Sequence, residues 1–327
     1  MNNLVDLDAA PALAPSPRNR RAMILPVVIF AAFALVPLVL LFGSQNYILA
    51  IVTRIMILAL GAMALDLLIG YGAMISFGHA AFVGLGAYSV AILASHGITD
   101  GFVQLAAVIA SSVIFALITG AISLRTKGVY FIMITLAFGQ MLFFLTTSLA
   151  AYGGDDGLTL AARSTFFGLK FMKNDLAMYY VTFGVLLGAY ILLRAVVGSR
   201  FGRVLRGIRE NPVRMEAIGF APYRYQLTAY VIAGLIAGVS GFLLANQTEF
   251  VSPAYTAWQR SGELIFVLVL GGLGSLHGAI LGAAAFTILA DVLSHYTENW
   301  AMIFGPILIL VVLFARGGIQ SLFGGKS

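Results

Sequence analysis

Residues 102–124 read FVQLAAVIASSVIFALITGAISL and contain no charged side chain. A helix of about 20 apolar residues is long enough to cross the hydrocarbon core of a bilayer. Asp100 precedes this stretch, whereas Arg125 and Lys127 follow it. Since Lys and Arg concentrate in cytoplasmic loops, this one segment predicts a membrane span and its direction, with the C-terminal end facing the cytoplasm.

The composition of the whole chain places it in the same class. Of its 327 residues, 61% are hydrophobic and 10% are charged, whereas soluble domains carry roughly 25% charged residues. Apolar runs of about 20 residues predict helices, because a transmembrane barrel would show alternating strands of about 10 residues. The net charge of +6 fits membrane orientation better than nucleic-acid binding. The chain has no cysteine, which excludes disulfides and thiolate metal sites.

The fold predicted from this pattern is an all-α, polytopic bundle of transmembrane helices with about ten spans. The short segment 262–276 is interrupted by glycines and could pair with 278–296 as a re-entrant element, which lowers the count to eight. An even number of spans puts both termini on one side. The apolar segments are 22–43, 47–69, 79–96, 102–124, 129–150, 176–197, 226–247, 262–276, 278–296 and 300–315.

The distribution of charge between the loops predicts that both termini are cytoplasmic. Arg125, Lys127 and the arginines of 198–225 fall in inner loops, whereas the outer loop 151–175 contains three aspartates. We therefore expect a disordered cytoplasmic tail at 1–21, a transmembrane domain at 22–316 and a cytoplasmic tail at 317–327. The loops 151–175 and 198–225 are the longest pieces outside the membrane, and each is too short to fold alone.

The inner loop contains a series of arginines and then a short, well-delimited helix. Arg200, Arg203, Arg206 and Arg209 are expected to continue the preceding span beyond the membrane and to reach lipid headgroups.

Asn211 is a good N-cap, Pro212 suits the first helical position, and Gly219 suits the left-handed conformation that ends a helix. Together they predict a helix of two turns at 212–218. Two turns are unstable alone in water, so this helix is expected to dock on another protein. Val213, Ala217 and Ile218 supply its apolar side.

Charged residues within spans are costly and require a reason. We expect Arg54 to form a structural ion pair with Asp291 or Glu263, or alternatively to face a transport pathway. Asp66 is too far along the same helix to pair with Arg54. The intramembrane charges that the sequence singles out are Arg54, Asp66, Glu263 and Asp291.

A glycine-rich stretch before the third span supplies a candidate substrate pathway at Ser76, Gly78 and His79. Ser76 is expected to cap the following helix, whose positive end favours a carboxylate. The alternative is a capped turn with a hydrogen-bonded histidine. The sequence offers no metal-ligand spacing and no catalytic triad, so we expect neither a metal site nor enzyme activity.

Four stretches resemble the LivM type of permease subunit from branched-chain amino acid ABC importers. The region 202–241, with its E-A-x-G core, is the most specific of them, while 70–88 is typical of a wider superfamily that includes sugar and urea permeases. The stretches are GYGAMISFGHAAFVGLGAY (70–88), RTKGVYFIMITLAFGQ (125–140), YGGDDGL (152–158) and GRVLRGIRENPVRMEAIGFAPYRYQLTAYVIAGLIAGVSG (202–241).

The resemblance implies a bacterial inner-membrane permease that forms half of a pathway for branched-chain or related amino acids. A LivH-type paralogue would form the other half, two ATPases would bind ATP, and a periplasmic protein would deliver substrate. This chain itself needs no cofactor, because its terminal GGKS lacks the first glycine of a P-loop, at Gln320. Alternatives are a permease for urea, amides or small carboxylates, or an ion-coupled secondary transporter. The implied ATPase-coupling residues are Arg209, Glu210, Asn211, Pro212, Arg214, Glu216, Ala217 and Gly219.

Overall fold

The computed structural model describes residues 20–40, 46–168, 171–297, 299–314 and 317–320. Most of the two predicted tails lies outside these residues. Each of the ten predicted apolar segments coincides with one helix, and two further helices, α7 and α8, fall in the arginine-rich loop. The helices are α1 (Arg20–Leu40), α2 (Asn46–Gly72), α3 (His79–Ser95), α4 (Gly101–Ser123), α5 (Val129–Ser148), α6 (Asp175–Gly198), α7 (Arg200–Glu210), α8 (Pro212–Ala217), α9 (Pro222–Thr248), α10 (Trp258–Gly271), α11 (Leu276–Tyr296) and α12 (Trp300–Phe314).

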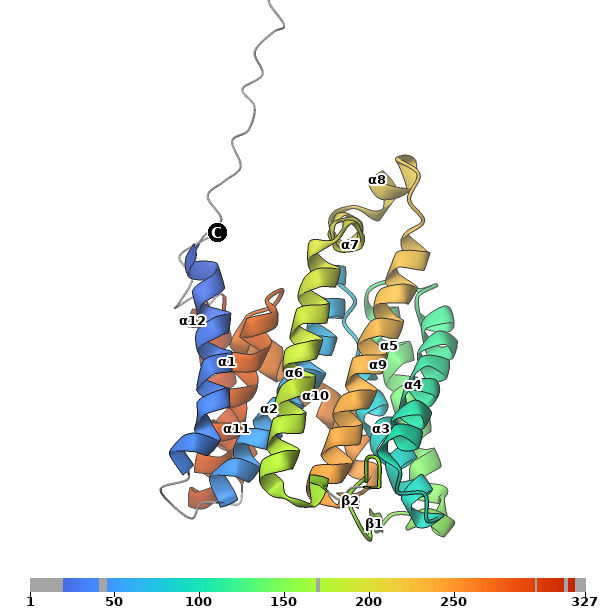
Figure 1. The fold of residues 1–327 in the computed structure, drawn as a ribbon. Helices are drawn as coiled ribbons and strands as arrows, with labels where there is room; N and C mark the ends of the chain where they lie inside the picture. Colours follow the sequence, from blue (N-terminus) through green and yellow to red (C-terminus); the bar gives the residue numbers. More distant parts are fainter. Residues whose placement is uncertain (1–19, 41–45, 169–170, 298, 315–316, 321–327) are drawn as a thin grey trace, which may run out of the picture.

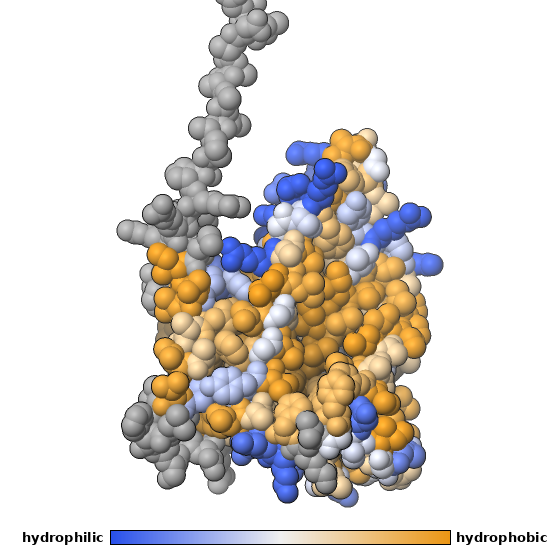
Figure 2. Space-filling model, in the orientation of Figure 1, coloured by the Kyte–Doolittle hydropathy of each residue, from blue (hydrophilic) through white to orange (hydrophobic). Residues whose placement is uncertain are grey.

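The protein is a multi-pass helical membrane protein. Six of its described helices, α2, α4, α5, α6, α9 and α11, are long and apolar enough to cross a bilayer. In Figure 1 the long helices run side by side, with α7 and α8 beyond one end of the bundle and the short strands β1 and β2 at the other. Figure 2 shows an apolar band around the middle and hydrophilic residues at both ends. The predicted total of about ten spans stays a prediction.

α2 is the central helix of the bundle. It packs against α6, α9, α10 and α11, which is expected of a helix whose sequence is apolar on every side. Its buried residues include Met56, Ala59, Met63 and Leu67, none of which is exposed. The elements needed to cover α2 therefore come mainly from the second half of the chain.

α3 and α9 approach each other closely along their backbones. A Cβ atom on Gly86 would meet the carbonyl oxygen of Gly238, and one on Gly241 would meet that of Val83. Small residues at helix contacts permit such approach in lipid, where tight packing replaces the hydrophobic effect. The glycines of α3 and α9 thus set the spacing of these two helices.

Two of the helices, α3 and α10, begin inside the bundle. Residues 73–78 leave the end of α2 without helical structure, and α3 starts only at His79. Likewise, the chain passes from α9 through β2 (Phe250–Val251) and the 3-10 turn η3 (Pro253–Tyr255) before α10 starts at Trp258. The two starting points meet, because the N–H of Ala80 donates a hydrogen bond to Ser261 Oγ at 2.9 Å.

The end of the bundle opposite α8, here called the β end, is held together by one arginine. Arg163 forms ion pairs with Asp175 at 2.7 Å and with Glu249 at 2.8 Å. The strand β1 (Leu158–Thr159) pairs antiparallel with β2 nearby. Two short 3-10 turns, η1 (Ala150–Tyr152) and η2 (Phe171–Lys173), complete the segment. The loop 151–175 is thereby fastened to the end of α9.

Candidate functional site

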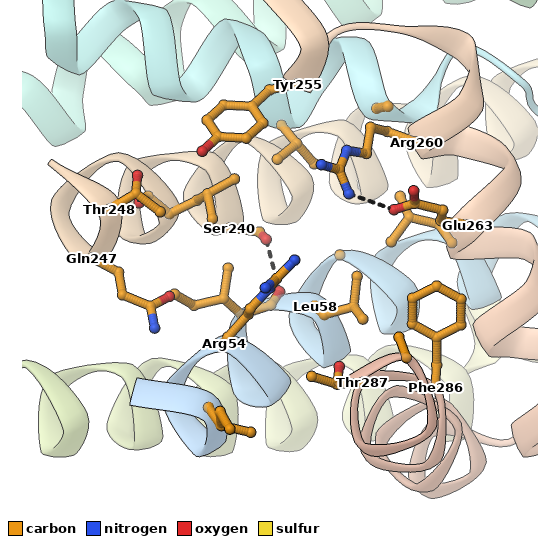
Figure 3. A pocket seen from close by; sticks show the side chains of 18 of the residues that line it. Arg54, Leu58, Ser240, Gln247, Thr248, Tyr255, Arg260, Glu263, Phe286 and Thr287 are labelled. Atoms are coloured by element: carbon orange, nitrogen blue, oxygen red, sulfur yellow. Dashed lines mark hydrogen bonds and ion pairs between the residues drawn. The ribbon is translucent and has the colours of Figure 1, made fainter. Parts of the chain in front are cut away.

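A cavity of about 520 Å³ lies between α2, α3, α9, α10 and α11. It extends from the β end of the bundle to the point where α3 and α10 begin, since its lining includes both Thr248 at the end of α9 and Ala80. Its volume falls within the range of about 300–1,000 Å³ that is typical of small-molecule sites. Figure 3 shows side chains from these helices pointing into a common space, among them Arg54, Leu58, Ser240 and Phe286.

The cavity contains the charged residues that the sequence singled out, but their pairing differs from the prediction. Glu263 pairs with Arg260, one helical turn before it, at 2.7 Å. Asp291 accepts a hydrogen bond from the hydroxyl of Tyr47 at 2.8 Å. Within the described residues Arg54 has neither an ion pair nor a hydrogen bond, so the predicted structural pair of Arg54 is wrong. Its exposed side chain lines the cavity instead.

Arg260 and Tyr47 were missed by the sequence reasoning. The i, i+3 spacing of Arg260 and Glu263 is the local signal that could have indicated their pairing. The contact between Tyr47 and Asp291 joins residues 244 positions apart, and no local pattern carries such information. Arg260 and Glu263 also line a second hollow of about 430 Å³ near Asp155 and Pro253, so this pair lies between the two spaces.

The predicted pathway residues Ser76, Gly78 and His79 lie beside the cavity but are buried within the protein. Ala80 and Val83, just after them, line the cavity. Among the described residues neither ring nitrogen of His79 has a hydrogen-bond partner, so the alternative of a hydrogen-bonded histidine is wrong.

Ser76 also has a different role from the one expected. Its Oγ accepts from the N–H of Gly78 at 3.4 Å, within the turn before α3. The N-cap position of α3 is occupied by Gly78, which offers no side chain. Ser261 of α10 provides the capping hydroxyl from across the bundle. The prediction that Ser76 caps the third span is therefore wrong.

Asp66 and Gly70, near the end of α2, contact two other elements at the α8 end. Asp66 is fully buried, and its Oδ1 accepts from the N–H of Gly274 at 2.8 Å, in the turn between α10 and α11. A Cβ atom on Gly70 would collide with the backbone of Gly274, so the end of α2 and this turn are in direct contact. Arg209 of α7 donates a hydrogen bond to the carbonyl of the same Gly70.

α7 is a separate helix, which corrects the expectation that the arginines continue the helix of the sixth span. Ser199 is extended and ends α6, and its Oγ accepts from the N–H of Gly202 at 3.4 Å to cap α7. Leu205 and Ile208 are buried on one side of α7, whereas Arg203 is exposed on the other. α7 thus lies across the end of the bundle, as Figure 1 shows.

α8 confirms the predicted short helix. The side chain of Asn211 accepts from the N–H of Arg214 at 3.0 Å, and Pro212 is the first helical residue. Gly219 has a φ of +93°, and the N–H of Phe220 donates to the carbonyl of Met215 at 3.0 Å. These bonds form a Schellman ending, in which a left-handed glycine closes the helix.

The side chains of α8 divide into an inward residue and an outward apolar face. Met215 is buried against α7, where the absence of a side chain on Gly207 leaves room for its sulfur. Val213 and Ile218 are 69% and 63% exposed. The helix therefore rests on α7 and presents Val213 and Ile218 away from the bundle.

Comparison with known proteins gives the family. Residues 47–313 match the family described as branched-chain amino acid transport system / permease component. The chain belongs to this family. It is 27% identical over 295 residues to the high-affinity branched-chain amino acid transport system permease protein LivM of Salmonella typhimurium, with 82% of this chain and 69% of the relative covered.

Two further relatives support the same assignment. LivM of Escherichia coli is 26% identical, with the same coverage of both chains. LivH of Escherichia coli, a permease protein of the same transport system, is 26% identical over 80% of this chain and 90% of its own length. No solved structure matches this protein.

Proposed function

We propose that this protein is the LivM-type permease subunit of an ABC importer for branched-chain amino acids in a bacterial inner membrane. Its similarity to both LivM and LivH supports a membrane unit made of two related permeases, of which this chain is one. The cavity supports transport of a small solute, because charged and apolar side chains line the same space within the bundle. Urea, amides and small carboxylates are the alternative substrates.

The observation that carries this proposal is the exposed helix α8. It is delimited at both ends and packed on α7 through Met215, yet Val213 and Ile218 are exposed to solvent. Exposed apolar side chains beyond the membrane indicate a protein contact. α8 is therefore proposed as the docking element for an ATPase subunit, with ATP bound by the two ATPases.

This assignment makes the α8 end cytoplasmic, together with both termini. The distribution of Lys and Arg supports this orientation, since the loop 198–225 contains six arginines and the loop 151–175 contains three basic residues balanced by three aspartates. The β end then faces the periplasm, where a binding protein delivers the substrate. The cavity of about 520 Å³ reaches that end, where Gln247, Thr248 and Ser294 line it.

The test is uptake of L-leucine by proteoliposomes that contain this chain, its LivH-type partner, both ATPases and the binding protein. Gly219→Ala combined with Glu216→Ala is expected to reduce uptake at least tenfold, because alanine at a φ of +93° is strained and deforms the end of α8. Gly188→Ala is the matched control, since nothing lies within 4 Å of a Cβ atom there. Equal uptake by the wild type, the double variant and Gly188→Ala would refute docking through α8.

An ABC importer requires ATP for uptake, whereas an ion-coupled secondary transporter does not. If the chain belongs to an ABC importer, the following result is expected. Uptake through this chain should stop when the ATPases are omitted or when ATP is replaced by a nonhydrolysable analogue. Competition by urea or by small carboxylates at the concentration at which L-valine competes would favour one of the alternative substrates. Uptake driven by an ion gradient without the ATPases would replace the ABC importer with a secondary transporter.

A further inference from the structure

We propose that the cavity between α2 and α11 is a binding site for a zwitterionic amino acid, with the carboxylate on Arg54 and the ammonium on Asp291. This inference rests on the proposed function, which it deepens by placing a substrate site within the permease itself. It differs from the pathway predicted at Ser76 and His79, which are buried in packed protein.

The cavity is lined by equal numbers of positively and negatively charged side chains. Its charged lining comprises Arg54, Arg260, Glu263 and Asp291. Arg260 and Glu263 neutralise each other at 2.7 Å. One cation, Arg54, and one anion, Asp291, are left, neither of which forms an ion pair within the described residues.

A ligand that carries one charge of each sign compensates both residues at once. A simple carboxylate would compensate Arg54 and leave Asp291 unpaired, while an amine would do the reverse. The side chain of Arg54 is exposed and that of Asp291 is partly exposed, so both groups are accessible to a ligand in the cavity. The residual charges therefore favour a zwitterion over either singly charged class.

The contact between Tyr47 and Asp291 relates the position of Asp291 to that of Arg54. Tyr47 and Arg54 are seven residues apart, so they lie on the same side of α2, about two helical turns apart. The hydroxyl of Tyr47 reaches Asp291 on α11 at 2.8 Å, which places Asp291 against that side of α2. α2 and α11 pack along each other, and both Arg54 and Asp291 line the cavity between them.

Apolar side chains make up much of the remaining lining of the cavity. Ile57, Leu58, Leu264 and Phe286 continue the cavity toward the centre of the bundle. Figure 3 shows Leu58 next to Arg54, and Phe286 farther along the cavity below Glu263. An amino acid held by its charged groups on Arg54 and Asp291 can place an apolar side chain against these residues. The site thus fits leucine, isoleucine and valine better than polar amino acids.

The experiment uses the absence of cysteine from the chain. Leu58→Cys is introduced into the purified pair of permeases in detergent, and its rate of reaction with a maleimide is measured with increasing L-leucine. We expect L-leucine to protect the cysteine. Neither 4-methylpentanoate, which lacks the ammonium, nor 3-methylbutylamine, which lacks the carboxylate, should protect it at the same concentration.

Two charge variants then test the assigned roles. Arg54→Gln and Asp291→Asn are each expected to raise the concentration of L-leucine needed for half protection by about tenfold or more, since each loses a charge-assisted contact. Arg125→Gln, whose charge lies at the α8 end, should leave protection unchanged. A cysteine at Thr159 on β1 controls for changes in reagent reactivity and should not be protected.

The outcomes distinguish this inference from the proposed function. Labelling of Leu58→Cys that no amino acid slows would overturn the site, even if the complete importer transports leucine. Protection that survives in both charge variants would overturn the roles of Arg54 and Asp291. Protection by L-leucine together with an importer that fails to transport it would support the site and refute the proposed function.

Discussion

The hydroxyl of Ser261 accepts a hydrogen bond from the backbone N–H of Ala80, 181 positions earlier in the chain, at 2.9 Å. This contact joins the first turns of α3 and α10. The first N–H groups of a helix have no partner within that helix, and those of α3 are buried in the bundle. A side chain from α10 therefore stabilises a helix start that would otherwise be costly within a membrane.

Ser261→Ala should reduce the stability of the protein. The substitution leaves the buried N–H of Ala80 without its acceptor, which costs about 1–3 kcal/mol of the free energy of unfolding. Thermal unfolding in detergent measures the effect as a lower Tm. Ser148→Ala is the matched control, because Ser148 is exposed and bonds only within its own helix. An equal Tm for the two variants would contradict the assigned role of Ser261.

Gly86→Ala should prevent the close packing of α3 on α9. The added Cβ atom would meet the carbonyl oxygen of Gly238, and backbone cannot rotate away as a side chain can. We expect the free energy of unfolding to fall by an amount near the upper end of the roughly 1–3 kcal/mol that overpacking costs. The measurement is the yield of monodisperse protein and its Tm for the isolated chain. Gly184→Ala, on an open face of α6, should behave as wild type; if Gly86→Ala does too, the two helices tolerate greater separation.

Arg209→Ala should weaken transport more than it weakens ATP hydrolysis. Arg209 connects α7 to the carbonyl of Gly70 at the end of α2, and α8 rests on α7. Without this bond, movement of α8 is transmitted less fully to the bundle. The ratio of leucine transported to ATP hydrolysed by the complete importer should fall about threefold or more, while Arg203→Ala, an exposed change on the same helix, should leave it unchanged. A ratio that falls equally in both variants would assign the effect to lost charge.

The orientation of the chain can be tested with single cysteines. Asp156→Cys in the outer loop and Arg214→Cys in α8 should react with an impermeant maleimide from opposite sides of the membrane. In intact spheroplasts we expect labelling at 156 alone, and labelling at 214 only after lysis. Labelling of both positions before lysis would refute the proposed direction of the bundle.

The helices of this fold were accessible from the sequence because hydrophobicity is a local property. Each predicted apolar segment became a helix, and Asn211, Pro212 and Gly219 fixed the ends of α8 through local hydrogen bonds and a left-handed φ. The break between α6 and α7 was missed, although Ser199 offered a capping signal. The arginines at every third residue suggested one continuous helix. In the structure the extended backbone of Ser199 alone separates α6 from α7.

The candidate site was less accessible, because its contacts join distant parts of the chain. Arg54, Glu263 and Asp291 were recognised as unusual, but their partners depend on how α2, α10 and α11 pack. Their expected depth in the membrane favoured a pair between Arg54 and either Glu263 or Asp291. In the structure Glu263 instead pairs with Arg260, and Asp291 accepts a hydrogen bond from Tyr47. Ser76 precedes α3 in the sequence and was therefore expected to cap it, but the hydroxyl that caps α3 belongs to Ser261 of α10.

The central position of α2 has a consequence for how the protein is made. The helices that bury it include α9, α10 and α11, which are synthesised about 200 residues after it. At roughly 5–20 residues per second, α2 waits about 10–40 s in the translocon or in lipid with its aspartate, Asp66, not yet covered. Asp66 obtains its bond to Gly274 only near the end of translation. Membrane insertion and the completion of tertiary structure are therefore separate events for this permease, and a ribosome that stalls before α10 leaves a chain in which α6 and α9 can pack on α2 while the side that α10 and α11 cover stays open.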